Sequence, residues 1–410
     1  MRAKDFLFSG EGEELQTVKR IVHAVDTIKA SSLRKLNRIK KGGEMRRSIL
    51  VLVVACLLVS VITGCAKEAT PTPTPEKKTV TIIDERGKQF EVPQPLERVC
   101  IFNTFNVELV RAVGGWQSVV GMDANAAQDK AYWPGFDTSN IIGQSQTAPN
   151  YEKIVALKPQ VVIFPSNGAW AEVEQKLNPF GIEVIVITGW AMDGFTERVA
   201  TLGLMFGKTE KAQELIGFYQ KYTDLVQEKV GKLEKKRRVY YESYGATSDY
   251  KTCLVGSGWN DMLVLAGGTN IFSDININEQ PQAKGTVHAF EIDPEAILVR
   301  NPQLVIKIEP GLQVRPGTGT STPPSADEMR ATWERLVNRP GWTKLEAVKN
   351  DQVHVMSPFP ANACSKMVGV CYLAKWLYPE LFPDLNPEAV MKEWIEKYQG
   401  VPYLGGYVYH

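Results

Sequence analysis

Aromatic, amide and hydroxyl side chains directly follow several short apolar runs of this 410-residue chain. Such side chains can bind a small molecule, because aromatic rings stack on planar groups while amides and hydroxyls form hydrogen bonds. The set is uncharged, and it favours a large planar or catecholate-like ligand. Its members are Asn103, Thr104, Phe105, Ser166, Asn167, Trp170, Trp190, Tyr244, Ser257, Trp259, Asn260, Phe359, Pro360 and Asn362.

Histidine is scarce, which bears on metal binding. His288 is a candidate ligand contact, although a single loop histidine is more often structural. With four histidines in the whole chain, a histidine-rich cage for bare zinc or manganese is not expected. We therefore expect no metal held directly by protein side chains and no resident cofactor. If a metal is bound, we expect it to be held by a chelating molecule, which the protein binds as a whole.

No catalytic motif is present. The chain contains no Gly-x-Ser-x-Gly elbow, no His-Glu-x-x-His pair and no phosphate-binding glycine loop. We expect a binding protein and not an enzyme.

One segment occurs twice, as NYEKIVALKPQVVI at residues 150–163 and as DPEAILVRNPQLVI at 293–306. The two copies share Glu152/Glu295, Ile154/Ile297, Pro159/Pro302, Gln160/Gln303, Val162/Val305 and Ile163/Ile306. Each copy predicts a helix, which Asn150 or Asp293 caps, followed by a buried strand. The repeat indicates two lobes of one architecture.

The segment before Cys65 is typical of an exported protein. Residues 45–64 carry two arginines and then an apolar run too short to span a bilayer, as in a signal peptide. The ending Val-Ile-Thr-Gly-Cys resembles a bacterial lipobox, so we expect Cys65 to carry lipid. Residues 65–78 then form the lipid anchor and a Pro/Thr-rich tether. An ordinary secretory signal with an incidental cysteine is the alternative.

Residues 1–44 do not fit a signal peptide, whose charged region should begin the chain. Lys-Lys-Gly-Gly-Glu, just before Met45, can be encoded by a purine-rich ribosome-binding site. We expect translation to start at Met45, with 1–44 wrongly assigned to the protein; a genuine amphipathic extension is the alternative.

The charge of the exported part argues against nucleic acid as a partner. Residues 1–64 hold 12 of the 47 Lys/Arg and 6 of the 46 Asp/Glu, which leaves a net charge of −5 for the rest. A mildly acidic domain binds nucleic acid poorly.

Beyond the tether, strand and helix patterns alternate, which predicts an α/β fold. We expect a hairpin at 79–92, then an N-terminal lobe to residue 205 with a parallel sheet between helices. Residues 206–235 predict one long backbone helix, and the alternation restarts in a C-terminal lobe over 236–410. The prediction is therefore two Rossmann-like lobes joined by one long helix. A ligand would lie between the lobes, at the carboxyl ends of the strands.

From about Thr79 onward the chain resembles the substrate-binding lipoproteins of ABC importers for iron-siderophores, haem and cobalamin, the class with a helical backbone. The best matches are YEKIVALKPQVVI, LGLMFGKTEKAQELI, WNDMLVLAGGTNIF and RPGWTKLEAVKNDQVHVM. The resemblance implies a monomer on the outer face of the cytoplasmic membrane, with an ABC permease dimer and its ATPase subunits as partners. It also implies a metal-chelate ligand: an iron-siderophore, haem or a corrinoid. The uncharged candidate pocket favours haem, a corrinoid or a neutral chelate.

The resemblance gives the repeated glutamates a role as well. In this class an acidic residue on each lobe docks into a basic pocket of the permease, and Glu152 and Glu295 hold the matching positions. The alternative is that the helix dipole alone favours a glutamate in a first turn. Two other functions stay open: the ligand-binding module of an extracellular sensor, and an exported metalloenzyme.

Overall fold

The computed structural model describes residues 78–242, 249–279, 286–309 and 321–410. Residues from Pro75 to His410 belong to one compact unit. Cys65, the signal and tether segments, the first 44 residues and Tyr244 lie outside the described residues.

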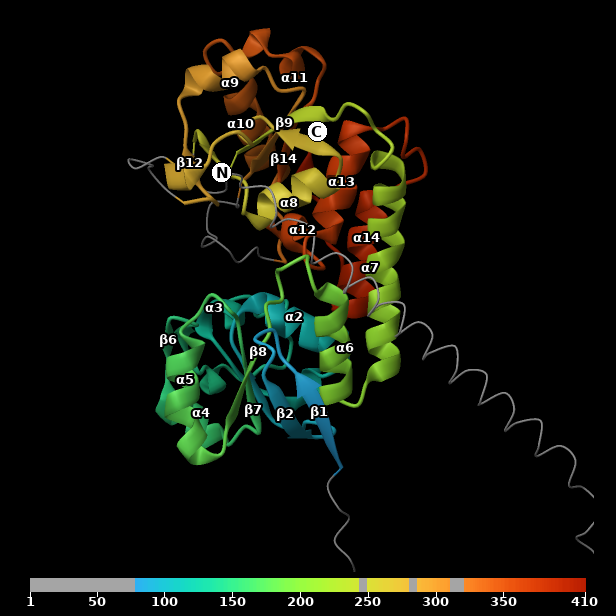
Figure 1. The fold of residues 1–410 in the computed structure, drawn as a ribbon. Coiled ribbons are helices and arrows are strands. Elements are labelled where there is room, and N and C mark those ends of the chain that lie inside the picture. The colour runs from blue at the N-terminus through green and yellow to red at the C-terminus, as the bar shows by residue number, and fades with distance from the viewer. Residues whose placement is uncertain (1–77, 243–248, 280–285, 310–320) are drawn as a thin grey trace, which may run out of the picture. The chain divides into compact units, whose positions relative to one another are not determined.

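The N-terminal lobe is built on a four-stranded parallel sheet, preceded by an antiparallel hairpin (Figure 1). The hairpin strands are β1 (Thr79–Ile83) and β2 (Gln89–Pro93). The sheet order is β4 (Val119–Met122), β3 (Val99–Ile101), β7 (Val161–Phe164) and β8 (Glu183–Val186). The other elements of this lobe are α2 (Thr104–Ala112), α3 (Ala124–Ala127), β5 (Gly143–Ser145), β6 (Ala148–Pro149), α4 (Tyr151–Leu157) and α5 (Trp170–Leu177).

The C-terminal lobe has a five-stranded sheet that is parallel except at one edge. Its order is β11 (Gly268–Asn270), β9 (Arg237–Glu242), β13 (Leu304–Ile308), β14 (Val353–Met356) and β15 (Val408–Tyr409), the last being antiparallel. The other elements are β10 (Lys251–Thr252), α8 (Gly258–Leu265), β12 (Phe290–Glu291), α9 (Pro294–Arg300), α10 (Ala326–Val337), α11 (Glu346–Lys349), α12 (Pro358–Asn362), α13 (Met367–Leu377) and α14 (Pro387–Glu393). The predicted α/β fold with parallel sheets is confirmed.

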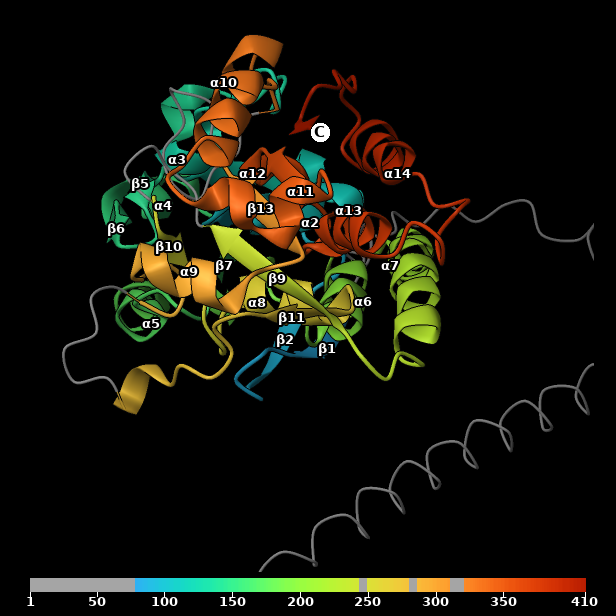
Figure 2. The same cartoon turned by 90° about the horizontal axis from the view of Figure 1, so that it is seen from above.

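Two helices join the lobes. α6 (Phe195–Met205) leads into α7 (Thr209–Val230), whose 22 residues extend about 33 Å at 1.5 Å per residue. Its buried positions include Leu215, Phe218 and Val226, which recur at helical spacing along one face. α7 contacts α2 and α6 of the first lobe, and α8 and α13 of the second. Both Figure 1 and Figure 2 show α13 beside α7.

The duplicated segment forms the same structure in each lobe. α4 and α9 each bury one isoleucine completely, Ile154 and Ile297. Each helix is also capped by the residue before it: Asn150 Oδ1 accepts from a backbone N–H 2.9 Å away, and so does Asp293 Oδ1. The shared residues therefore build the helix–strand unit, as the sequence predicts.

The repeated glutamines tie this unit to the neighbouring strand. Gln160 Oε1 accepts from the backbone N–H of Arg98 at 3.0 Å, and Gln303 Oε1 accepts from that of Arg238 at 3.1 Å. Arg98 and Arg238 precede β3 and open β9, the strands next to β7 and β13. Each glutamine thus aligns two parallel strands of its own sheet.

Strand β13 of the C-terminal lobe contains a buried charged residue, which its largely apolar sequence does not predict. Lys307 on β13 has no exposed side-chain surface and lies 2.9 Å from the carboxylate of Glu242 on β9. Arg339 donates to the same carboxylate through two nitrogens, at 2.6 and 3.0 Å. Asp249 and Glu309 lie 3.8 and 3.7 Å from the Lys307 ammonium. Each buried cation therefore has carboxylates around it, as charges removed from water require.

Candidate functional site

The loop after β8 lies so close to α2 that residue 189 must be glycine. A Cβ on Gly189 would lie 2.6 Å from the backbone of Phe105. The Gly189 N–H donates to Asn106 Oδ1 at 2.7 Å, at the start of α2. This contact fixes the next residue, Trp190, whose half-buried ring lies edge-on to Phe105 with the centroids 6.2 Å apart. Two of the predicted ligand contacts therefore form one aromatic surface.

A chain of amides crosses the carboxyl ends of the N-terminal strands. Asn103 has φ 80° and ψ 131°, a strained backbone outside the left-handed helical region, and its Oδ1 caps α2 by accepting from the Phe105 N–H at 3.0 Å. Its Nδ2 donates to Gln146 at 3.1 Å, and Gln146 Nε2 donates to Asn167 at 2.7 Å. Asn103 and Asn167, predicted from separate strand ends, thus belong to one polar network.

A second group of predicted residues gathers at the start of α8. Ser257 Oγ caps this helix and lies 3.0 Å from Nδ1 of His288, whose ring is exposed. The ring of Trp259 stacks on Tyr241 with the centroids 5.5 Å apart. The structure therefore brings Ser257, Trp259 and His288 together.

Other predicted residues lie in packing positions. Asn260 and Phe359 are each 5% exposed: Asn260 accepts from Asn270, and Phe359 packs edge-on against Tyr132. Trp170 opens α5 beneath the guanidinium of Arg86. Thr104 is half-buried in the first turn of α2, and Ser166 is exposed after β7.

The loop between α12 and α13 joins the two groups. Cys364, Ser365 and Lys366 all have positive φ, between 46 and 71. This conformation, which is unfavourable for residues other than glycine, turns two side chains toward the loop after β8. Ser365 Oγ donates to the carbonyl of Gly189 at 2.6 Å, and Lys366 Nζ donates to that of Trp190 at 2.7 Å.

Lys366 is the charged group at this junction. It is 4% exposed, and its ammonium lies 5.5 Å from the ring centroid of Trp259. The pKa of Lys366 is lowered to about 8, chiefly by burial; the charge of Asp261 opposes this shift and that of Arg198 adds to it. The ammonium therefore connects Trp190 of one lobe with Trp259 of the other.

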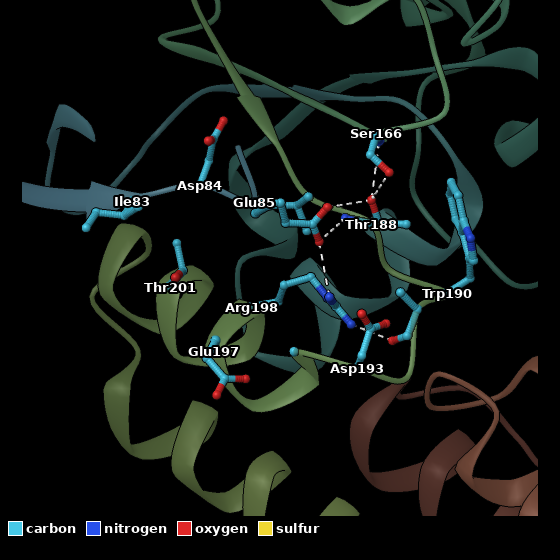
Figure 3. A pocket seen from close by; sticks show the side chains of 13 residues that line it. Ile83, Asp84, Glu85, Ser166, Thr188, Trp190, Asp193, Glu197, Arg198 and Thr201 are labelled. Carbon is cyan, nitrogen blue, oxygen red and sulfur yellow. Dashed lines mark hydrogen bonds and ion pairs between the residues drawn. The ribbon is translucent and has the colours of Figure 1, made fainter. Parts of the chain in front are cut away.

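A cavity of about 650 Å³ opens beside the same loop, between the hairpin, β8 and α6 (Figure 3). Inside it, Glu85 accepts from the Thr188 N–H at 2.8 Å and from Arg198 Nη1 at 3.2 Å. Thr188 Oγ1 lies 2.8 Å from Ser166 Oγ, and Arg198 Nη2 also donates to the Ala191 carbonyl. The cavity is lined by Ile83, Asp84, Glu85, Ser166, Ile187, Thr188, Trp190, Ala191, Asp193, Gly194, Glu197, Arg198 and Thr201.

The lining of this cavity is charged. Four carboxylate residues and an arginine lie among its walls, in contrast to the uncharged set predicted for the ligand. Asp84 pairs with Arg86 and Glu85 pairs with Arg198, while Asp193 and Glu197 are exposed. The cavity therefore suits an anionic group poorly, although it shares Trp190 with the junction between the lobes.

The repeated glutamates occupy equivalent surface positions. Glu152 lies in the first turn of α4 and Glu295 in the first turn of α9, and both are exposed. One turn further along α9, Val299 is 84% exposed. These side chains are available to a partner.

Three further observations concern metals, thiols and membranes. The described part of the chain contains no cluster of three or more His, Cys, Asp or Glu side chains arranged to hold a metal ion. Cys100, Cys253, Cys364 and Cys371 are buried free thiols. In the same described ranges, no helix is long and apolar enough to cross a bilayer.

The comparison with known sequences decides the family. Residues 99–358 match the profile of the periplasmic binding proteins. The chain belongs to this family. Its members bind solutes outside the cytoplasm, and the solved structures below share its fold.

Relatives with different ligands share this fold. The molybdate-binding protein MolA of Haemophilus influenzae is 21% identical over 86% of this chain and 97% of its own length. A vitamin B12-binding protein of Salmonella paratyphi A is 29% identical over 38% of this chain and 54% of its own. The TroA-like protein FepB of Veillonella parvula superposes with a TM-score of 0.64 at 24% identity, covering 81% of this chain and 99% of that one. The structure of molybdate-bound MolA gives a TM-score of 0.58 at 18% identity, over 79% and 99% of the two chains.

Sequence reasoning missed three residues of the site: Lys366, Arg198 and Glu85. Their sequence neighbourhoods carry no motif, and the hairpin, α6 and the α12–α13 loop are far apart in the chain. A lysine directly before the apolar helix of residues 367–377 was the available signal for Lys366, because a cation is disfavoured at a helix N-terminus.

Proposed function

We propose that this protein is the extracytoplasmic solute-binding component of an ABC importer, with a metal chelate as its cargo. The candidate chelates are iron-siderophores, haem and corrinoids. Relatives that bind molybdate and vitamin B12 support a metal-containing solute, and several similar structures are described as ABC transporter binding proteins. The cargo would be bound and released unchanged.

The observation that carries this proposal is a contact between the lobes at Lys366, next to residues that bear aromatic rings in each lobe. Phe105 and Trp190 follow strands of the first sheet, whereas Trp259 belongs to the second lobe. Lys366 joins them, because its ammonium contacts the Trp190 carbonyl and faces the Trp259 ring. Carboxyl ends of parallel strands are where α/β folds bind ligands, and planar ligands stack on aromatic rings.

Delivery would use the repeated glutamates. Their equivalent exposed positions on α4 and α9 suit a symmetric partner, such as a permease dimer that presents one basic pocket to each lobe. Separated charges of this kind speed association and set its orientation. A lipid on Cys65 would hold the protein near that permease, on the outer face of the cytoplasmic membrane.

Tryptophan fluorescence provides the test of cargo binding. The purified protein is titrated with hemin, cyanocobalamin, a ferric tris-catecholate and molybdate, and we expect saturable quenching by at least one of them. A Trp190→Leu variant should lose most of that signal and weaken binding. The matched control, Trp170→Leu, changes a tryptophan that packs on Arg86, and it should bind normally. If none of the four solutes binds, the proposed cargo class is wrong.

A further inference from the structure

Lys366 differs from Lys307, the other deeply buried lysine among the described residues, in how its charge is balanced. Lys307 has the Glu242 carboxylate at 2.9 Å, with Glu309 and Asp249 next to it. Lys366 is 4% exposed, but within the described residues no carboxylate forms an ion pair with it. Its polar partner is the Trp190 carbonyl. A buried cation without a counter-ion is unfavourable, so its presence here calls for a reason other than stability.

The surroundings of the ammonium add positive potential. A Cβ on Gly258, the first residue of α8, would lie 3.4 Å from Lys366 Nζ. The ammonium therefore lies against the N-terminus of this helix, where the helix dipole favours an anion. Arg198, on the other side of the loop after β8, also acts on Lys366 through its charge. The negative charge that acts on Lys366 comes from Asp261, whose side chain is exposed.

The Lys366 ammonium also has more N–H donors than the Trp190 carbonyl uses. A lysine carries three N–H groups, and the Trp190 carbonyl uses one of them. His288 lies nearby: its Nδ1 is 3.0 Å from Ser257 Oγ, and its pKa is lowered by partial burial and by the charge of Lys366. The ring of Trp259 lies 5.5 Å from the ammonium, and the backbone carbonyl of Trp190 contacts it.

We propose that Lys366 binds an anionic group of the cargo, such as a carboxylate, a catecholate oxygen or an oxyanion oxygen. This inference rests on the proposed function and narrows it. The cargo is an anionic chelate or oxyanion, with its charge at the junction of the lobes and its planar part on the aromatic rings.

Calorimetric titration of the purified protein tests this assignment. The probes are molybdate, hemin and a ferric tris-catecholate, which are anionic, and cyanocobalamin, which carries no net charge. For Lys366→Met we expect at least one anionic probe to bind about ten- to a hundredfold more weakly, the usual effect of losing a hydrogen bond to a charged group. The matched control is Lys375→Met on the same helix, because Lys375 donates to the carbonyls of Phe382 and Pro383 away from the junction. That control should bind as the wild type does.

A second variant keeps the test valid if Lys366→Met does not fold. Gly258→Ala retains the charge but places a methyl group 3.3 Å from Lys366 Cε and 3.4 Å from Nζ. It should weaken the anionic probes severalfold, and raised salt should weaken them further. Unchanged anion affinity in Gly258→Ala and in a folded Lys366→Met overturns the inference. Binding of cyanocobalamin alone overturns it too, while the proposed function stands; binding of no probe by the wild type removes both.

Discussion

Replacing Glu242 by glutamine should destabilise the C-terminal lobe strongly, because this carboxylate is the shared acceptor of a buried network. It accepts from Arg339 at 2.6 and 3.0 Å, from Lys307 at 2.9 Å and from the Tyr240 hydroxyl at 2.9 Å. Glutamine keeps the shape but removes the charge that offsets two buried cations. Removing one partner of a buried ion pair costs about 3–5 kcal/mol.

The assay is thermal and urea unfolding followed by tryptophan fluorescence. At about 2 °C per kcal/mol, the low end for a large domain, the expected cost corresponds to a loss of about 6–10 °C in Tm. Glu380→Gln is the matched control, since Glu380 pairs with Arg237 at 3.2 Å but is 56% exposed. Such a surface pair contributes about 0–1 kcal/mol. A Glu242→Gln variant no less stable than this control would refute the reasoning.

The same carboxylate gives the stability a pH dependence. Burial alone would raise the pKa of Glu242, but the hydrogen bonds from Arg339 and the charge of Lys307 lower it below the usual 4.5. A lowered pKa in the folded state means that the stabilisation is present above pH 4.5 and is lost as the pH falls through the folded value. The difference in stability between wild type and Glu242→Gln should therefore shrink in acid. A difference that stays constant down to pH 3 would contradict this assignment.

The remaining predictions concern docking, anchoring and the cargo site. The double variant Glu152→Lys/Glu295→Lys should abolish uptake of the cargo in cells while calorimetry shows unchanged cargo affinity; a lost affinity would argue against docking. Cys65→Ala should release the protein from the membrane fraction, and metabolic labelling with a fatty acid should fail; continued membrane retention with labelling would exclude Cys65. Since the pKa of Lys366 is lowered to about 8, its charge is lost as the pH rises through that value, so anionic probes should bind progressively more weakly between pH 7 and 9. Equal weakening of cyanocobalamin would point to a general effect of pH.

Local patterns were sufficient for most of the fold. Apolar β-branched runs predict β3, β7, β8 and β13, because strands covered on both faces are uniformly apolar. The spacing of Leu215, Phe218 and Val226 predicts α7 as one long helix. The edge strand β15 was missed, since Val408–Tyr409 is too short to show any period.

The site was predictable only in part, because its decisive contacts are not local. Trp190 and Trp259 were predicted as candidates because they follow strands, and His288 because it precedes the second copy of the repeat. The pairing of Lys366 with the Trp190 carbonyl joins residues that lie 176 positions apart. The loop of Cys364, Ser365 and Lys366 has positive φ angles, but it contains no glycine from which this conformation could be predicted. Contacts between residues so far apart in the chain cannot be predicted from composition or from the spacing of apolar residues.

The central claim, that a solute binds at the junction between the lobes, is tested most directly by hydrogen exchange of the protein with and without a saturating solute identified by titration. We expect slower hydrogen exchange of the backbone N–H groups around Phe105, Trp190 and Trp259 when the solute is bound, in both lobes at once. Protection confined to the cavity of Glu85 and Arg198, or to one lobe alone, would contradict it.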